Sequence, residues 1–143
     1  MARYLQTFYH VHRFLKIAFV LFALLSCGRL VAQPAGYDVF VPISKYMAQG
    51  NADNLSAWFD DNLEIAVVSQ GSNASKAQAK QIVKTFFENY TPRSFEVNHT
   101  AGRDNMKYAL GTLKAGGENF SVTIFVSSKG KSYKIQQLKI ERL

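Results

Sequence analysis

Cysteine is almost absent from this chain, since Cys27 is the single cysteine among 143 residues. One thiol cannot form an internal disulfide, and it cannot supply a cluster of thiolate metal ligands. The fold must therefore be held together by packing. A hydrophobic fraction of 48%, with 11 Phe and 7 Tyr, is sufficient for the core of one domain of this length.

Acidic residues are missing from the first 32 residues, where Arg3, Arg13, Lys16 and Arg29 lie. The remaining 111 residues hold 13 of the 17 basic residues and all 10 acidic ones, so the net charge of +7 falls to +3 there. This excess is scattered and forms no basic stripe with interleaved aromatic residues, the pattern typical of nucleic-acid binding. We expect no nucleic-acid partner.

A long hydrophobic run is also missing, because the apolar stretch 17–25 is much shorter than the ~20 residues that span a bilayer. Its length, and the basic residues Arg13 and Lys16 before it, are typical of a secretory signal peptide. Ala32 provides a small residue at the cleavage point. We predict a signal peptide over residues 1–32, a short segment over 33–37, one domain over 38–143, and no transmembrane span in the mature chain.

Cys27 provides a second route of export, because Leu24-Leu25-Ser26-Cys27 resembles the box that precedes lipid attachment in bacterial lipoproteins. Cleavage after Ala32 predicts a periplasmic or extracellular protein. Lipidation at Cys27 predicts a lipoprotein instead. Both alternatives are open at this stage.

The first half of the domain has helical patterns. Helices are predicted over 39–49, where Asp38 can cap the start and Gly50 the end, and over 52–59, where Asp60-Asp61-Asn62 breaks the helix. A strand is predicted over 63–69. Ser75 and Gln78 form a capping box ahead of a long amphipathic helix that ends at Thr91-Pro92.

From Arg93 onward the hydrophobic period changes from 3.6 to 2, which predicts four strands joined by hairpins. Tyr133 and Ile135 are in one phase of the last strand and Leu138 and Ile140 in the other, so we expect a bulge at Gln136-Gln137. The fold class is α+β, in the order α-α-β-α-β-β-β-β. Bent over the long helix, this sheet would enclose a cone with an open end.

Several segments together carry a family resemblance. They are residues 75–79, Phe86-Phe87, and residues 94–99, 107–113 and 135–141. The chain resembles a bacterial family of small exported proteins of unknown function, with a nuclear transport factor 2-like or cystatin-like fold. The resemblance covers nearly all of residues 38–143. It implies a curved antiparallel or mixed sheet wrapped around a long helix, and it implies no established activity.

Aromatic residues with polar edges are the candidates for a pocket that binds a small apolar or flat ligand. The predicted ligand-binding residues are Tyr46, Trp58, Phe86, Tyr90, His99 and Tyr108. The alternative is that these aromatic side chains, together with Tyr133, pack against one another and fill the core.

His99 is the only histidine of the domain and the one candidate for a general base. The resemblance implies a precedent, because the superfamily includes isomerases and dehydratases that use Asp or His in such cones. Asp60, Asp61 and Glu64 lack the spaced oxygen ligands of a calcium loop, so helix termination explains them more simply. We expect no metal and no cofactor.

The function predicted from these observations is an exported binding or interaction module, with a small apolar ligand or an envelope protein as its partner. The alternatives are a small isomerase-like or dehydratase-like enzyme that uses His99, and a dimerising envelope scaffold. The scaffold would form a homodimer through the sheet, whose outer face we expect to carry Ala109, Leu113 and Phe125.

Overall fold

The computed structural model of the chain describes residues 38–143. The predicted signal peptide, the cleavage point at Ala32 and the lipidation site at Cys27 lie outside the described residues. The elements are α2 (Phe40–Gln49), α3 (Ala52–Ser56), β1 (Phe59–Val67), β2 (Gln70–Ser75), α4 (Lys76–Asn89), β3 (Pro92–Arg103), β4 (Met106–Ala115), β5 (Glu118–Lys129) and β6 (Ser132–Arg142). They make an α+β fold, as the sequence predicts.

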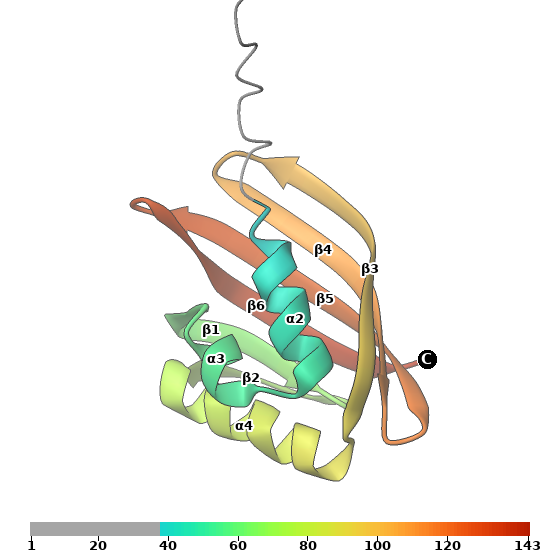
Figure 1. Cartoon of the computed structure of the whole chain (residues 1–143). Helices are drawn as coiled ribbons and strands as arrows, with labels where there is room; N and C mark the ends of the chain where they lie inside the picture. The colour runs from blue at the N-terminus through green and yellow to red at the C-terminus, as the bar shows by residue number, and fades with distance from the viewer. Residues whose placement is uncertain (1–37) are drawn as a thin grey trace, which may run out of the picture. The chain divides into compact units, whose positions relative to one another are not determined.

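One mixed sheet contains all six strands of the described region, in the order β2-β1-β6-β5-β4-β3. Neighbouring strands are antiparallel except β1 and β6, which are parallel. The strands β3, β4 and β5 curve around α2, while α4 lies across the β1–β2 end of the sheet (Figure 1). Both helices bury apolar side chains against the strands, among them Ile43 of α2 and Val83 of α4.

The helix ends follow the local signals in the sequence. The Asp38 carboxylate accepts a hydrogen bond from the Phe40 N–H at 2.9 Å, and Gly50 ends α2 in the left-handed conformation at φ 63°. At the start of α4, the Gln78 N–H donates to Ser75 Oγ at 3.2 Å and the Ser75 N–H donates to Gln78 Oε1 at 3.0 Å. The predicted capping box is therefore confirmed.

The predicted bulge in the last strand is confirmed as well. Phe125 pairs with Gln137 while Val126 pairs with Ile135, so Gln136 is an extra residue on β6. Because of this extra residue, Ile135 before the bulge and Leu138 after it both point into the core and are fully buried. A strand without the extra residue would expose one of the two.

The element order contains one strand more than the sequence predicts. Residues 70–75 form β2, which pairs with β1 as a hairpin, so the order is α-α-β-β-α-β-β-β-β. Residues Gln70 to Ser75 are small or polar, with no β-branched side chain. The turn at Val68-Ser69 lacks the Asn or Gly that such hairpins favour, so no local signal marked this strand.

The acidic run after α3 was also predicted wrongly. The helix ends at Ser56, and Asp60, Asp61 and Asn62 lie inside β1 rather than in a helix-breaking loop. The strand starts early because Trp58 accepts a backbone hydrogen bond from the Ile135 N–H at 2.7 Å, and Phe59 is buried. Pairing with a distant strand overrides the local turn signal.

Candidate functional site

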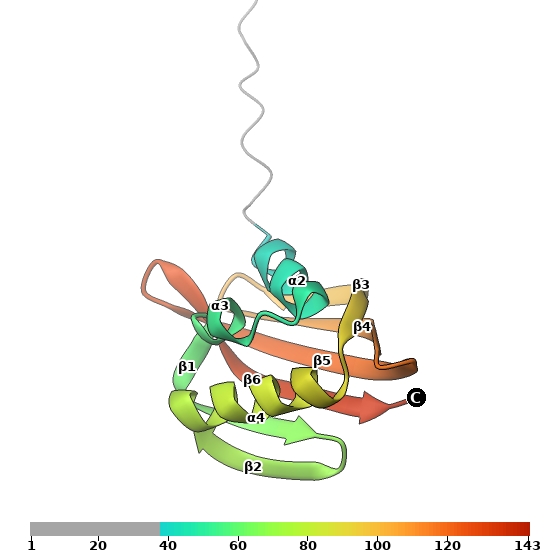
Figure 2. The same ribbon diagram turned by 60° about the horizontal axis from the view of Figure 1, so that its bottom comes forward.

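A groove opens between α4 and the β1–β2 hairpin. β2 ends at Ser75 and α4 begins at Lys76, so no loop separates the strand from the helix. The chain reverses its direction there, and the second half of α4 therefore lies at the same end as the turn between β1 and β2 (Figure 2). The groove at this end has a volume of about 600 Å³.

The lining is apolar in its middle and polar but uncharged at its margins. The residues are Ile65, Val67, Val68, Gln70, Gly71, Ser72, Gln81, Ile82, Thr85, Phe86, Asn89 and Tyr90. Carboxamides and hydroxyls can both donate and accept hydrogen bonds. No described residue that lines this groove is ionisable near neutral pH. The groove is therefore suited to an uncharged ligand.

One wall of the groove is aromatic and held firmly in place. The rings of Phe86 and Tyr90 lie 5.2 Å apart, and each lies 5.2 Å from the fully buried ring of Phe120 in an edge-on arrangement. Arg142 donates a hydrogen bond from Nη2 to the Tyr90 hydroxyl at 2.5 Å. This hydroxyl is thereby tied to the end of β6.

The hairpin turn at the lip of the groove is conformationally strained. Val68 and Ser69 both have positive φ, at 49° and 70°, and neither is glycine. A β-branched residue in this region is an outlier, and such outliers concentrate at functional sites. The Val68 N–H donates to the Ile140 carbonyl at 2.9 Å, and its side chain packs partly against the core. These contacts hold Val68 over the groove.

Of the six predicted ligand-binding residues, Phe86 and Tyr90 line the groove. Tyr46 and Trp58 are half-buried and pack against the core away from the groove lining, as the filled-core alternative describes. The rings of Phe86 and Tyr90 also pack against the buried ring of Phe120, which joins them to the core. The structure thus brings two of the six together at the site.

His99 and Tyr108 lie elsewhere, next to each other on the sheet, with ring centroids 6.0 Å apart. Val97 pairs with Gly111 and His99 pairs with Leu110, so Asn98 is an extra residue on β3. This second bulge reverses the phase of the strand, and His99 is exposed. It does not line the groove, so its position does not support the enzymatic alternative.

The predicted outer face of the sheet is wrong for two of its three residues, because only Phe125 lies on that face. Ala109 and Leu113 are fully buried and belong to the core. On β4 it is Leu110 that is exposed, and the half-buried Tyr108 pairs with Phe125 on β5. The strands alternate as predicted, but on β4 the buried side is the one that carries Ala109, Gly111, Leu113 and Ala115.

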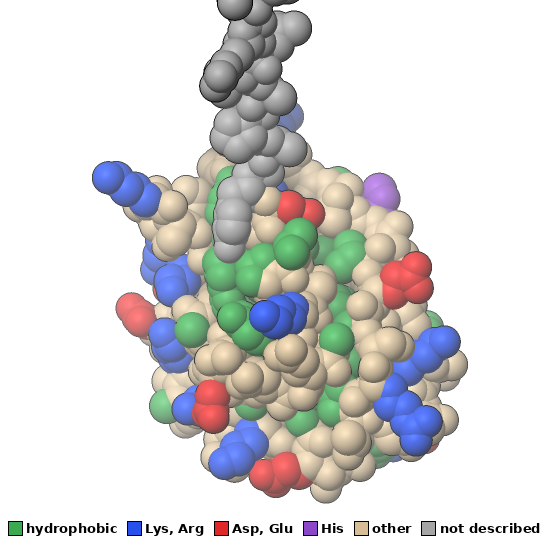
Figure 3. Space-filling view, viewed as in Figure 1, with side chains coloured by type: hydrophobic (Ala, Val, Ile, Leu, Met, Phe, Trp, Pro, Cys, Tyr) green, Lys and Arg blue, Asp and Glu red, His purple; other side chains and the backbone are tan. Residues whose placement is uncertain are grey.

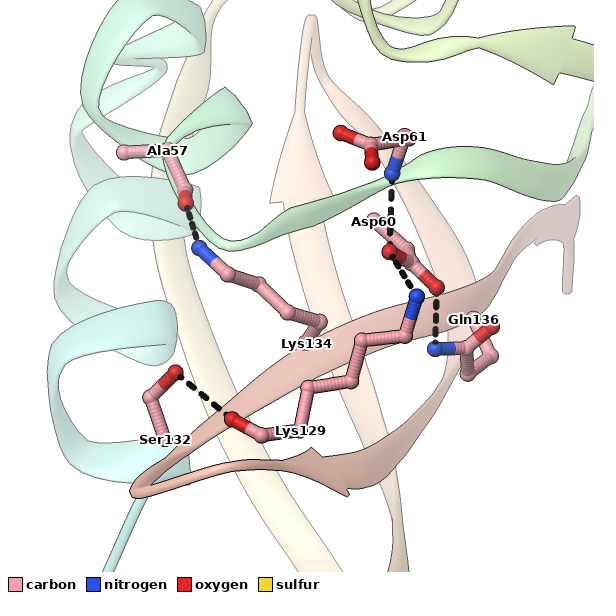
Figure 4. Close-up of polar contacts among 7 residues, drawn as sticks. All are labelled: Ala57, Asp60, Asp61, Lys129, Ser132, Lys134 and Gln136. Carbon is pink, nitrogen blue, oxygen red and sulfur yellow. Dashed lines mark hydrogen bonds and ion pairs between the residues drawn. The ribbon is translucent and has the colours of Figure 1, made fainter.

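Asp60 is the acidic residue of its cluster that the structure buries, with a side chain 10% exposed. It accepts hydrogen bonds from Lys129 Nζ at 2.7 Å, from the Gln136 amide at 2.7 Å and from the Asp61 N–H at 2.9 Å (Figure 4). The Lys129 ammonium holds the pKa of Asp60 below its ordinary value, and Asp60 in turn raises the pKa of Lys129. This arrangement anchors the bulge residue Gln136.

The rest of that cluster is open to solvent, since Asp61 and Glu64 are both exposed. Within residues 38–143, no group of three or more His, Cys, Asp or Glu side chains is arranged to hold a metal ion. Asp60 is the partner of Lys129 and Gln136.

The surface over α2 is different in character from the groove. Apolar side chains gather along this helix, with charged side chains of both signs spread around them (Figure 3). Val41 is the most exposed apolar residue of α2, at 66%. No helix in the described part of the chain is long and apolar enough to cross a membrane.

The polar residues of the groove were not predicted from the sequence. Gln81, Thr85 and Asn89 follow one another at helical spacing on α4 beside Ile82, between the buried stripe and the solvent face. The solvent face of this helix carries Lys76, Lys80 and Lys84, whereas the row of Gln81, Thr85 and Asn89 beside it carries no charge. This difference is a signal that could have identified the polar residues of the groove. The contribution of β2 could not be foreseen without the hairpin.

Solved structures of three kinds are similar to the described fold. A DUF4783 family protein from Bacteroides uniformis has a TM-score of 0.71 at 26% identity, covering 74% of this chain and 98% of its own. An NTF2-type protein of the Rd1NTF2_05 series has a TM-score of 0.59 at 14% identity, covering 69% and 90%. A domain of unknown function with a cystatin-like fold from Nostoc punctiforme has a TM-score of 0.58 at 11% identity, covering 71% of each chain.

The last two similarities concern the fold alone, and they confirm the predicted NTF2-like or cystatin-like architecture. No curated protein matches the sequence. The domain of unknown function DUF4783 matches residues 40–141, which include every helix and all but the last residue of the strands described above. The chain therefore belongs to the DUF4783 family.

Proposed function

We propose that this protein is an exported binding module whose groove between α4 and the β1–β2 hairpin takes a small, uncharged and largely apolar ligand. The observation that carries the proposal is the groove itself, with an apolar middle, an aromatic wall at Phe86 and Tyr90, and an uncharged polar margin. Export is supported by the basic and apolar composition of the first 32 residues.

Apolar burial favours a neutral ligand in this groove, and the cost of desolvation disfavours a charged one. A ligand that covers Val67, Val68 and Ile82, which are half-buried apolar residues of the lining, gains about 25 cal/mol for each Å² of apolar surface removed from water. An ionic ligand would lose its hydration and find no counter-charge among the lining residues. The carboxamides of Gln81 and Asn89 can orient a neutral polar group without such a loss.

Titration of the full chain with the neutral dye Nile red tests the binding function. We expect its fluorescence to rise on binding, and Ile82→Lys to weaken binding roughly tenfold because a charge then lies in the apolar middle of the groove. Ala77→Lys is the matched control, since Ala77 is exposed on the same helix and outside the groove. Equal binding by both variants would contradict the groove assignment.

The export proposal has its own test. Intact-mass measurement of the protein purified from its native source should give a chain that begins at Gln33, if cleavage follows Ala32, or a lipidated chain that begins at Cys27. Either mass supports export. A mass that includes residues 1–26 would refute it.

A further inference from the structure

The two edge strands of the sheet, β3 and β2, differ in charge, in proline content and in the regularity of their pairing. The edge strand β3 begins with Pro92, carries the charged residues Arg93 and Glu96, and has two register shifts against β4. Proline, charge and bulges are the features that keep an edge strand from pairing with another chain. The edge strand β3 is therefore protected.

The opposite edge, β2, has none of these features. Its sequence, Gln-Gly-Ser-Asn-Ala-Ser, contains no charged residue and no proline, and its pairing with β1 is regular over all six residues. The first four of them are exposed. In the described part of the chain, β2 is the outermost strand, and no strand lies beyond it (Figure 2).

The backbone phase of β2 follows from the capping box. The Ser75 N–H donates to Gln78 rather than to β1, so the pair Asn62 and Ser75 does not exchange two hydrogen bonds. Antiparallel pairs alternate between bonded and non-bonded, which puts Gly71 and Asn73 in the same phase as Ser75. Gly71 and Asn73 therefore direct their N–H and C=O groups toward the free edge.

The side chains of β2 alternate in the same way. Ala74 is buried, and Gln70 and Ser72, which share its phase, line the groove beside α4. A chain paired with the free edge would place every second side chain on the same side of the sheet, next to Ser72 and above the groove. The unpaired backbone groups and the groove therefore adjoin each other.

We propose that the ligand of this groove is an extended, uncharged peptide segment that adds to β2 as a seventh strand and inserts alternate apolar side chains toward Ile82 and Phe86. This inference rests on the proposed function of the groove. A peptide strand is the occupant that satisfies both features, because it supplies backbone donors and acceptors for Gly71 and Asn73 and apolar groups with a period of two. The uncharged lining selects against Lys, Arg, Asp and Glu in the inserted positions.

Amide hydrogen exchange on the full chain tests the pairing without any substitution. The probe is a capped synthetic heptapeptide of alternating Thr and Val. We expect saturating peptide to slow exchange at Gly71 and Asn73 at least tenfold and to leave Ser72 nearly unchanged, because the Ser72 N–H already faces β1. Protection that misses Gly71 and Asn73 would overturn the proposal.

Two pairs of variants separate the backbone from the groove. Asn73→Pro removes one outward N–H and should weaken peptide binding about fivefold, the effect of one hydrogen bond, whereas Asn73→Thr keeps that N–H and should bind normally. Ile82→Lys should weaken binding about tenfold and Ala77→Lys should not. Equal binding by Asn73→Pro and Asn73→Thr, with both variants folded, would contradict edge pairing.

The remaining outcomes are distinguishable. If Nile red binds in an Ile82-dependent way but the peptide does not protect β2, the strand proposal fails and the proposed function stands. If neither probe binds, both fail. Protection of Gly71 and Asn73 that rises with protein concentration in the absence of peptide would overturn the peptide proposal in favour of a second copy of this chain.

Discussion

The buried carboxylate of Asp60 offers a sharp test of how this fold is held together. Asp60 joins the start of β1 to the end of β5 through Lys129 and to the bulge of β6 through Gln136. We predict that Asp60→Asn lowers the free energy of unfolding at pH 7 by about 1.5 kcal/mol and that Asp60→Ala lowers it by about 3 kcal/mol.

These magnitudes follow from what each variant leaves unpaired. The Asn side chain has the same size but one acceptor oxygen in place of two, so it loses the charge that faces Lys129. The Gln136 amide can offset the lost acceptor by turning its own oxygen toward the new NH2 group. The Ala side chain leaves Lys129, Gln136 and the Asp61 N–H all without their acceptor. Lys129 is about half exposed and can regain water, so the loss stays below that of a fully buried pair.

The pH dependence has a definite sign. The pKa of Asp60 is lowered from its ordinary value of 3.8 by the hydrogen bond from Lys129, so the folded state binds the proton less tightly than the unfolded state does. The stabilisation is therefore present above pH 4 and is lost as the pH falls through the folded pKa. The difference between the wild-type chain and Asp60→Asn should narrow progressively below pH 4.

Urea unfolding followed by circular dichroism and by the fluorescence of the single tryptophan, Trp58, measures these differences. Asp53→Asn is the control, because the Asp53 carboxylate also pairs with a lysine, Lys80 at 2.8 Å, but is 76% exposed. Its effect should be small. Equal stability of Asp60→Asn and wild type at pH 7, or a difference that does not depend on pH, would refute the reasoning.

Two further predictions concern backbone positions. Ser69→Gly should stabilise the chain by about 0.5 kcal/mol, because glycine adopts the φ of 70° without steric cost, whereas Ser69→Ala should give no gain; thermal unfolding compares them. Gly111→Ala should destabilise it by about 3 kcal/mol in urea unfolding, because the new methyl group would lie 2.6 Å from the Glu96 carbonyl oxygen and from the Phe95 ring. A Gly111→Ala variant of unchanged stability would show that β3 can move away from β4 at little cost.

Some features were determined by the sequence through contacts between near neighbours. Ser75 and Gln78 are three residues apart, so their capping box needed no knowledge of the fold. Gly116 and Gly117 both have positive φ in the β4–β5 turn, as a two-glycine hairpin predicts. The bulge at Gln136 followed from the two hydrophobic phases of its own strand.

The site itself was determined by pairings between distant residues. Residues 70–75 became a strand because β1 lies beside them, and the groove exists because that strand diverges from α4. His99 is exposed because the extra residue Asn98 is tolerated against β4, which no local pattern indicates. Asp60 lies in a strand because the backbone beside it pairs with β6, and Lys129, 69 residues later, then supplies its counter-charge. Hydrophobic period and capping act within a few residues, whereas register, bulges and buried charge pairs depend on which distant backbone is adjacent, and only the tertiary structure decides that.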